Sequence, residues 1–129
     1  MKLFIKREDV IVKEVSDENG NDHEIRLRHS MSPVVRNAAN ELYITQQENK
    51  EKATEADKNK DVRSQVEIVK AIDDANMAMY ASFIESWTFE DELTDDIALN
   101  VVINNKELRD FIDDNCYKKE QEYNAKKNN

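Results

Sequence analysis

The sequence has little of the residues that form tight turns, with one glycine and one proline among its 129 residues. A many-stranded sandwich or barrel needs such residues at most of its turns, so their scarcity favours helices. The single cysteine, Cys116, excludes an intrachain disulfide framework and fits a reducing compartment. No apolar run approaches the roughly 20 residues that span a bilayer, and charge follows Ile5 too soon for a secretory signal. We therefore expect one small domain, or one domain with tails, in the cytoplasm.

Positive charge is also scarce, because 28 acidic residues outnumber 19 lysines and arginines and give a formal net charge of −9. Binding to nucleic acid depends on lysines and arginines that neutralise phosphates, so this balance argues against it. An acidic surface instead favours solubility and suits a basic protein partner. We expect neither nucleic acid nor a membrane among the partners.

Residue types that carry catalysis or bind metals are sparse or unfavourably placed. His23, His29 and Cys116 lack the short paired spacing of a structural zinc site. Cys116 lies on an apolar helix face, which predicts a buried thiol rather than a nucleophile. Acidic pairs such as Asp73-Asp74 and Asp95-Asp96 fall on predicted polar faces and helix starts, and one glycine cannot form a phosphate-binding loop. We expect no enzyme, no metal and no cofactor.

The strongest pattern covers residues 61–89, where apolar side chains recur at spacings of three, four and seven residues. This period predicts one long helix with an apolar face. The face consists of Val62, Val66, Val69, Ile72, Met79, Phe83 and Trp87. We expect it to be the core helix of the domain, although Asp73, Asp74 and Asn76 interrupt the face. A dedicated partner surface is the alternative.

Other helices are indicated by their start signals. Ser32-Pro33 predicts a helix capped by the serine, and the all-polar segment 45–61 is expected to be a solvated helix end and a mobile connector, with a charged docking arm as the alternative. Thr94 precedes two acids and predicts the cap of a short helix. A last helix after Asn105 would place four apolar residues on one face, namely Leu108, Phe111, Ile112 and Cys116.

The N-terminal part predicts a β-hairpin. Residues 10–15 are rich in β-branched side chains, residues 24–28 alternate polar and apolar, and Asn19-Gly20 lies between them. Residues 3–5 are a candidate extension. Two strands alone are marginal in water, so the hairpin must pack on a helix or pair with another subunit. The expected fold is mainly α with a small N-terminal β-hairpin (α+β) and a small helical bundle. We divide it into a hairpin (1–30), a helical domain (31–116) with the polar connector (45–61), and a flexible tail (117–129).

Three sequence features together resemble the tail assembly chaperones of long-tailed bacteriophages, over most of residues 24–115. Residues 24–33 look like the short strand that leads directly into the first helix of that family, and Trp87 followed by acids is similar to its tryptophan at the end of the second long helix. The third feature is Leu93-Thr94-Asp95-Asp96 followed by Ile97 and Leu99, then Asn105, Leu108 and Ile112. It resembles the ending of the family, with Asp96 where glutamate is typical.

The resemblance implies a protein that is not an enzyme. It would coat the tape-measure protein in the host cytoplasm, keep that long helical rod soluble, recruit tail-tube subunits and then leave. Candidate partner-binding residues are Met77, Met79, Phe83, Trp87, Leu99 and Phe111, although these side chains would suit a buried core equally well. A homo-oligomer is expected, because a small hairpin leaves an edge that a neighbour can complete.

Two other functions remain open from the sequence. One is a structural virion or adaptor protein that stays in the particle. The other is an acidic protein that binds and regulates a basic host partner, its negative surface mimicking nucleic acid. The first predicts presence in purified virions, and the second predicts a salt-sensitive complex with one basic protein.

Overall fold

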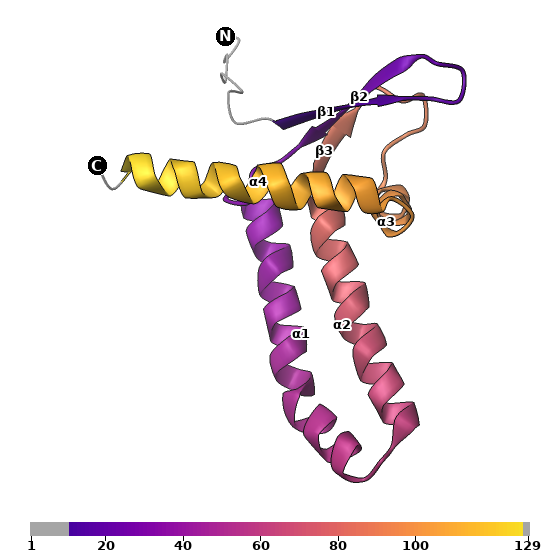
Figure 1. Cartoon of the computed structure of the whole chain (residues 1–129), viewed down its shortest axis with the longest axis vertical. Coiled ribbons are helices and arrows are strands. Elements are labelled where there is room, and N and C mark those ends of the chain that lie inside the picture. The colour runs from indigo at the N-terminus through magenta and orange to yellow at the C-terminus, as the bar shows by residue number, and fades with distance from the viewer. Residues whose placement is uncertain (1–10, 128–129) are drawn as a thin grey trace.

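The computed structural model describes residues 11–127, which form a small three-stranded sheet and four helices (Figure 1). The elements in chain order are β1 (Ile11–Ser16), β2 (Asp22–Leu27), α1 (Pro33–Lys58), α2 (Val62–Ser82), β3 (Ile84–Trp87), α3 (Asp95–Ile103) and α4 (Lys106–Lys127). The predicted α+β class with few strands is confirmed. Within residues 11–127, no helix is both long and apolar enough to cross a membrane.

The predicted hairpin is present, and a third strand completes it into a sheet. Strands β1 and β2 pair antiparallel across a turn in which Gly20 has a φ of +79°, a conformation that glycine adopts without strain. The Asp17 carboxylate accepts hydrogen bonds from the backbone N–H groups of Asn19 and Asn21, both at 2.9 Å, which fixes the turn. The candidate extension at residues 3–5 lies outside the described residues.

Residues 61–89 do not form one helix, so that prediction is wrong. Helix α2 ends at Ser82, and residues 84–87 instead form β3, which pairs antiparallel with β2 and places Trp87 opposite Ile25. Ile84 and Trp87 are good strand formers. The spacing of four between Phe83 and Trp87 imitates a helical face, whereas the pairing with β2 is a tertiary contact that periodicity cannot reveal.

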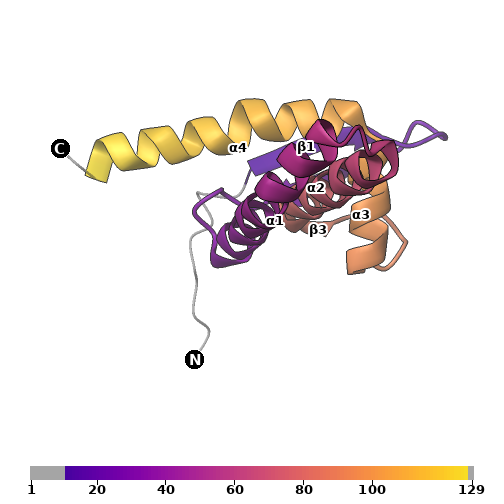
Figure 2. The ribbon, with the colours of Figure 1, turned by 90° about the horizontal axis from the view of Figure 1, so that it is seen from below.

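Helices α1 and α2 form an antiparallel pair, here called the arm, that projects from the rest of the molecule (Figures 1 and 2). Helix α1 begins at Pro33 as expected, but the Ser32 side chain makes no capping hydrogen bond, which corrects the predicted serine cap. The expected connector over 45–61 is helical as far as Lys58, so the chain turns within three residues, 59–61. Asp61 then caps α2, its Oδ1 accepting from the Ser64 N–H at 3.1 Å.

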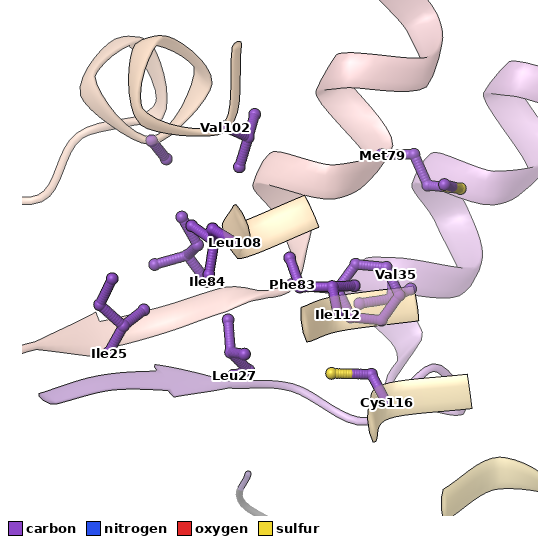
Figure 3. Packing of buried hydrophobic residues seen from close by; sticks show 11 residues of the cluster. Ile25, Leu27, Val35, Met79, Phe83, Ile84, Val102, Leu108, Ile112 and Cys116 are labelled. Carbon is purple, nitrogen blue, oxygen red and sulfur yellow. The ribbon is translucent and has the colours of Figure 1, made fainter. Parts of the chain in front are cut away.

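The core lies where the sheet, the base of the arm, α3 and α4 meet (Figure 3). Its buried residues are Ile25, Leu27, Val35, Met79, Phe83, Ile84, Ala98, Val102, Leu108, Ile112 and Cys116. Helix α4 runs across one side of the arm's base and supplies Leu108, Ile112 and Cys116 at spacings of four (Figures 1 and 2). Burial raises the pKa of the Cys116 thiol to about 12, as the predicted buried cysteine requires.

The cap of α3 agrees with the sequence prediction, whereas the C-terminal end of α4 differs from it. Thr94 caps α3 as expected, with its hydroxyl accepting from the Ile97 N–H at 3.2 Å, and Asp95 and Asp96 occupy the first turn. Residues 117–127, where the sequence predicts a flexible tail, continue α4.

Candidate partner-binding surfaces

The valines at the far end of α2 face solvent. Val62, Val66 and Val69 are 67%, 60% and 57% exposed, whereas Ile68 between them is 9% exposed. Their spacings of four and then three residues are those of the apolar positions in a coiled coil. The prediction that these valines belong to the core is therefore wrong. They form an unpartnered stripe on the arm, which we call the valine seam.

Charges of both signs border the valine seam. The residues that follow the three seam valines are Arg63, Glu67 and Lys70, which alternate in sign. Each lies about 100° around the helix from the residue before it. Arg63 Nε is 4.0 Å from Glu67 Oε1, and both side chains are largely exposed. The seam thus has the arrangement found where an amphipathic helix packs on another, an apolar stripe flanked by alternating charges.

A second surface is a groove of about 480 Å³ between the sheet and the two C-terminal helices. Apolar side chains make up most of its lining, namely Val15, Ile25, Trp87, Phe89, Ile97, Val101 and Leu108. Trp87, the only tryptophan of the chain, is half-buried there. The volume of the groove falls within the range of about 300–1,000 Å³ typical of ligand pockets.

A hydrogen bond and an aromatic contact hold Trp87 in this groove. Its indole Nε1 donates to the Asp91 carbonyl oxygen at 2.9 Å, and its ring meets Phe89 edge-on with centroids 5.5 Å apart. The other face of this cluster is closed by His23, which stacks on Phe89 at 4.3 Å and lies 2.8 Å from an Asp17 oxygen. That hydrogen bond lowers the pKa of the Asp17 carboxyl.

The edge of the groove is acidic. Among the described residues that line it, Asp91 and Glu107 carry exposed carboxylates, and Lys13 is the one cation. Glu14 lies between Lys13 and Val15 on β1, so its side chain points to the opposite face of the sheet. The Lys13 ammonium lies 5.0 Å from the centre of the Phe111 ring and 3.4 Å from a Glu107 oxygen, and its side chain is only 16% exposed. Lys13 is therefore engaged inside the protein. We call the carboxylates of Asp91 and Glu107 the acidic rim.

The six candidate residues from the sequence fall in different places. Met79 and Phe83 are buried in the core, Leu99 and Phe111 are half-buried against it, Met77 is half-buried on α2, and Trp87 lines the groove. The structure thus brings only Trp87 to either surface. The seam valines were not among the candidate residues, although a partner surface was the alternative for this face. The polar residues that interrupt the face at positions 73, 74 and 76 are a signal that its two halves differ.

Among residues 11–127, no group of three or more histidine, cysteine or acidic side chains is placed to hold a metal ion. Comparison with known proteins adds no further guide, because no family model, curated protein or solved structure matches the chain. The functional argument therefore depends on the two surfaces.

Proposed function

We propose that this protein is a non-enzymatic assembly chaperone that binds an amphipathic helix of a partner along the valine seam. The observation that carries the proposal is the exposure of Val62, Val66 and Val69 in one stripe on a projecting arm. An amphipathic helix laid on this stripe would make a third helix beside α1 and α2, the helix-in-groove mode of recognition. Its own apolar face would be covered in the same step.

The seam is large enough to contribute measurably to binding. Fully burying a valine stabilises a complex by about 1.5–3 kcal/mol relative to exposure, and each seam valine retains 57–67% of its exposure. Covering each one would therefore contribute about 1 kcal/mol, and the three together about 3 kcal/mol. This sum corresponds to roughly a 100-fold change in affinity.

The partner class follows from the resemblance to tail assembly chaperones. Their client, the tape-measure protein, is a long helical rod that needs its apolar surface covered before the tail is built around it. A body with a net charge of −9 would keep such a complex dispersed in the host cytoplasm. Recruitment of tail-tube subunits belongs to the same proposal, as does self-association of the chaperone through surfaces other than the valine seam.

The test is co-expression with a candidate tape-measure protein, followed by size-exclusion chromatography with light scattering. The wild-type chain should keep the rod soluble and co-elute with it in several copies. A variant with Val62→Gln, Val66→Gln and Val69→Gln should lose the complex. Glutamine favours helix more than valine does, so these changes at exposed positions leave the arm intact.

A matched control carries Val34→Gln and Ile103→Gln, which alter valine and isoleucine side chains of similar exposure, 48% and 47%, outside the seam. It should hold the rod as the wild type does. Equal loss in both variants, or a rod that precipitates beside the wild-type chain, contradicts the proposal. A dimer of the chain alone that dissociates only in the seam variant would show that a second copy occupies the seam, and would also contradict it.

A further inference from the structure

We propose that the groove beside Trp87 is a second binding site, which takes a basic segment of a partner protein that inserts an apolar or aromatic side chain. This inference does not depend on the valine seam or on its occupant. Two separate properties of the groove support this second binding site, namely its apolar lining and its acidic rim.

The apolar lining calls for a side chain that excludes water. Trp87 and Phe89 line the groove with aromatic rings, and Ile97 and Val101 of α3 line it with aliphatic side chains. An inserted aromatic side chain would pack on these rings in the offset or edge-to-face arrangements that such pairs prefer. A single arginine or lysine beside it could also lie on the indole, the best of the aromatic rings for a cation.

The rim sets the charge of the occupant. The two carboxylates of Asp91 and Glu107 against the one ammonium of Lys13 leave a net charge of −1 at the groove. Lys13 is not available to an acidic ligand, because Glu107 and the Phe111 ring already engage it. Asp91 and Glu107 are exposed at the edge and can pair with cations that flank the inserted residue. The net charge of −9 on the whole chain attracts such a segment from a distance.

The open form of the groove favours a stretch of polypeptide over a small enclosed molecule. It runs from residues 13–16 of β1 to the beginning of α4 and is lined by all three strands, by α3 and α4 and by the loop that precedes each of these helices. β1 is an edge strand of the sheet that the described residues form. A partner segment can therefore enter and leave at the sides while one side chain fills the middle.

Trp87 makes the test direct, because the only tryptophan of the chain lines the proposed site. Its fluorescence is followed during titration of the full-length protein with a blocked pentapeptide that has phenylalanine between two pairs of lysines. We expect a saturable shift of the emission, and weaker binding at higher salt. The same peptide with alanine in place of phenylalanine should bind at least about tenfold more weakly.

Variants locate the binding. Asp91→Asn with Glu107→Gln should weaken the phenylalanine peptide by about fivefold, whereas Glu41→Gln with Glu48→Gln removes two exposed carboxylates from the arm and should leave it unchanged. The seam variant described above should also bind normally, which separates this site from the proposed function. Equal affinity for the alanine peptide, tighter binding of a glutamate-flanked phenylalanine peptide, or equal loss in both acid variants would overturn the inference.

Discussion

Arg28 joins the end of α2 to the beginning of β3, and its replacement should destabilise the fold at that junction. Its guanidinium Nη1 donates to the carbonyl oxygens of Ser82 and Ile84, each at 2.8 Å. Its backbone N–H donates to the Phe83 carbonyl oxygen. One residue thus binds three consecutive carbonyls at the point where the chain changes from helix to strand.

The expected loss can be worked out from these contacts. A hydrogen bond to a charged group contributes about 1.5–3 kcal/mol, and the lower value applies because the Arg28 side chain is half-buried. Arg28→Met keeps the aliphatic stem and the backbone bond but removes both side-chain bonds, so it should cost about 3 kcal/mol. Arg28→Lys keeps a cationic donor on a shorter side chain, so it should retain part of these bonds and cost about half as much.

Urea denaturation followed by Trp87 fluorescence measures the effect. At a slope of about 2 kcal/mol per molar urea, Arg28→Met should lower the midpoint by about 1.5 M. Arg36→Met, an exposed position on α1, serves as control and should change stability by less than about 0.5 kcal/mol. If Arg28→Met behaves like this control, water replaces the guanidinium at the two carbonyls and the assignment of Arg28 as the link between α2 and β3 is refuted.

Four further changes test other parts of the structure. Leu108→Ala empties a position that is 1% exposed and should lower the free energy of unfolding by about 3 kcal/mol in the same assay. Thr94→Ala should cost about 1 kcal/mol through loss of the α3 cap, and Thr94→Ser should restore most of it. Burial and the hydrogen bond to Asp113 raise the pKa of Tyr80 to about 12. Because the unfolded chain loses the Tyr80 proton near pH 10, the free energy of unfolding should fall as pH rises from 10 to 12. Tyr80→Phe should flatten that fall. The Cys116 thiol, with its raised pKa, should react with a thiol reagent at pH 8 only as fast as the protein unfolds, and immediately in urea.

The sequence predicted those elements whose signals are local. The hairpin depends on Asn19-Gly20 between two strand-forming segments, and the start of α3 depends on Thr94 and the acids that follow it. The buried face of α4 follows from a spacing of four between Leu108, Ile112 and Cys116. Each of these features lies within a few residues, so chain neighbours alone decide it.

The elements that the sequence did not predict depend on contacts with residues far away in the chain. Strand β3 exists because β2, some 60 residues earlier, offers it an edge. The second half of α1 has too little apolar surface to form a stable helix alone, and it is held against α2, where Ala56 and Ile68 are the buried residues. The polar residues 45–58 therefore form the expected solvated helix end, and the expected connector is reduced to the turn at residues 59–61.

The valine seam shows why exposure could not be predicted from periodicity. Ile68 and Ile72 lie on the same turns of α2 as Val66 and Val69. The apolar residues of this segment are therefore spread over two faces of the helix. Which face meets α1 is decided by the packing of the arm, and the structure assigns that role to Ile68, which is buried. An apolar stripe in a sequence identifies a surface that avoids water without identifying what covers it.

The separation of the two surfaces bears on what the protein can do with both. At about 1.5 Å of helix per residue, Val66 lies about 24 Å along α2 from Ser82 at the base of the arm, while the groove lies between the sheet and α3, at that base. A helix on the valine seam and a basic segment in the groove would thus occupy separate parts of the molecule, each with its own charges. A chaperone built this way can hold one partner by its arm and a second by its body at the same time. Binding of the lysine-flanked peptide should then be as tight to the complex with the helical partner as to the free chain, and competition between the two would mean that they share one site.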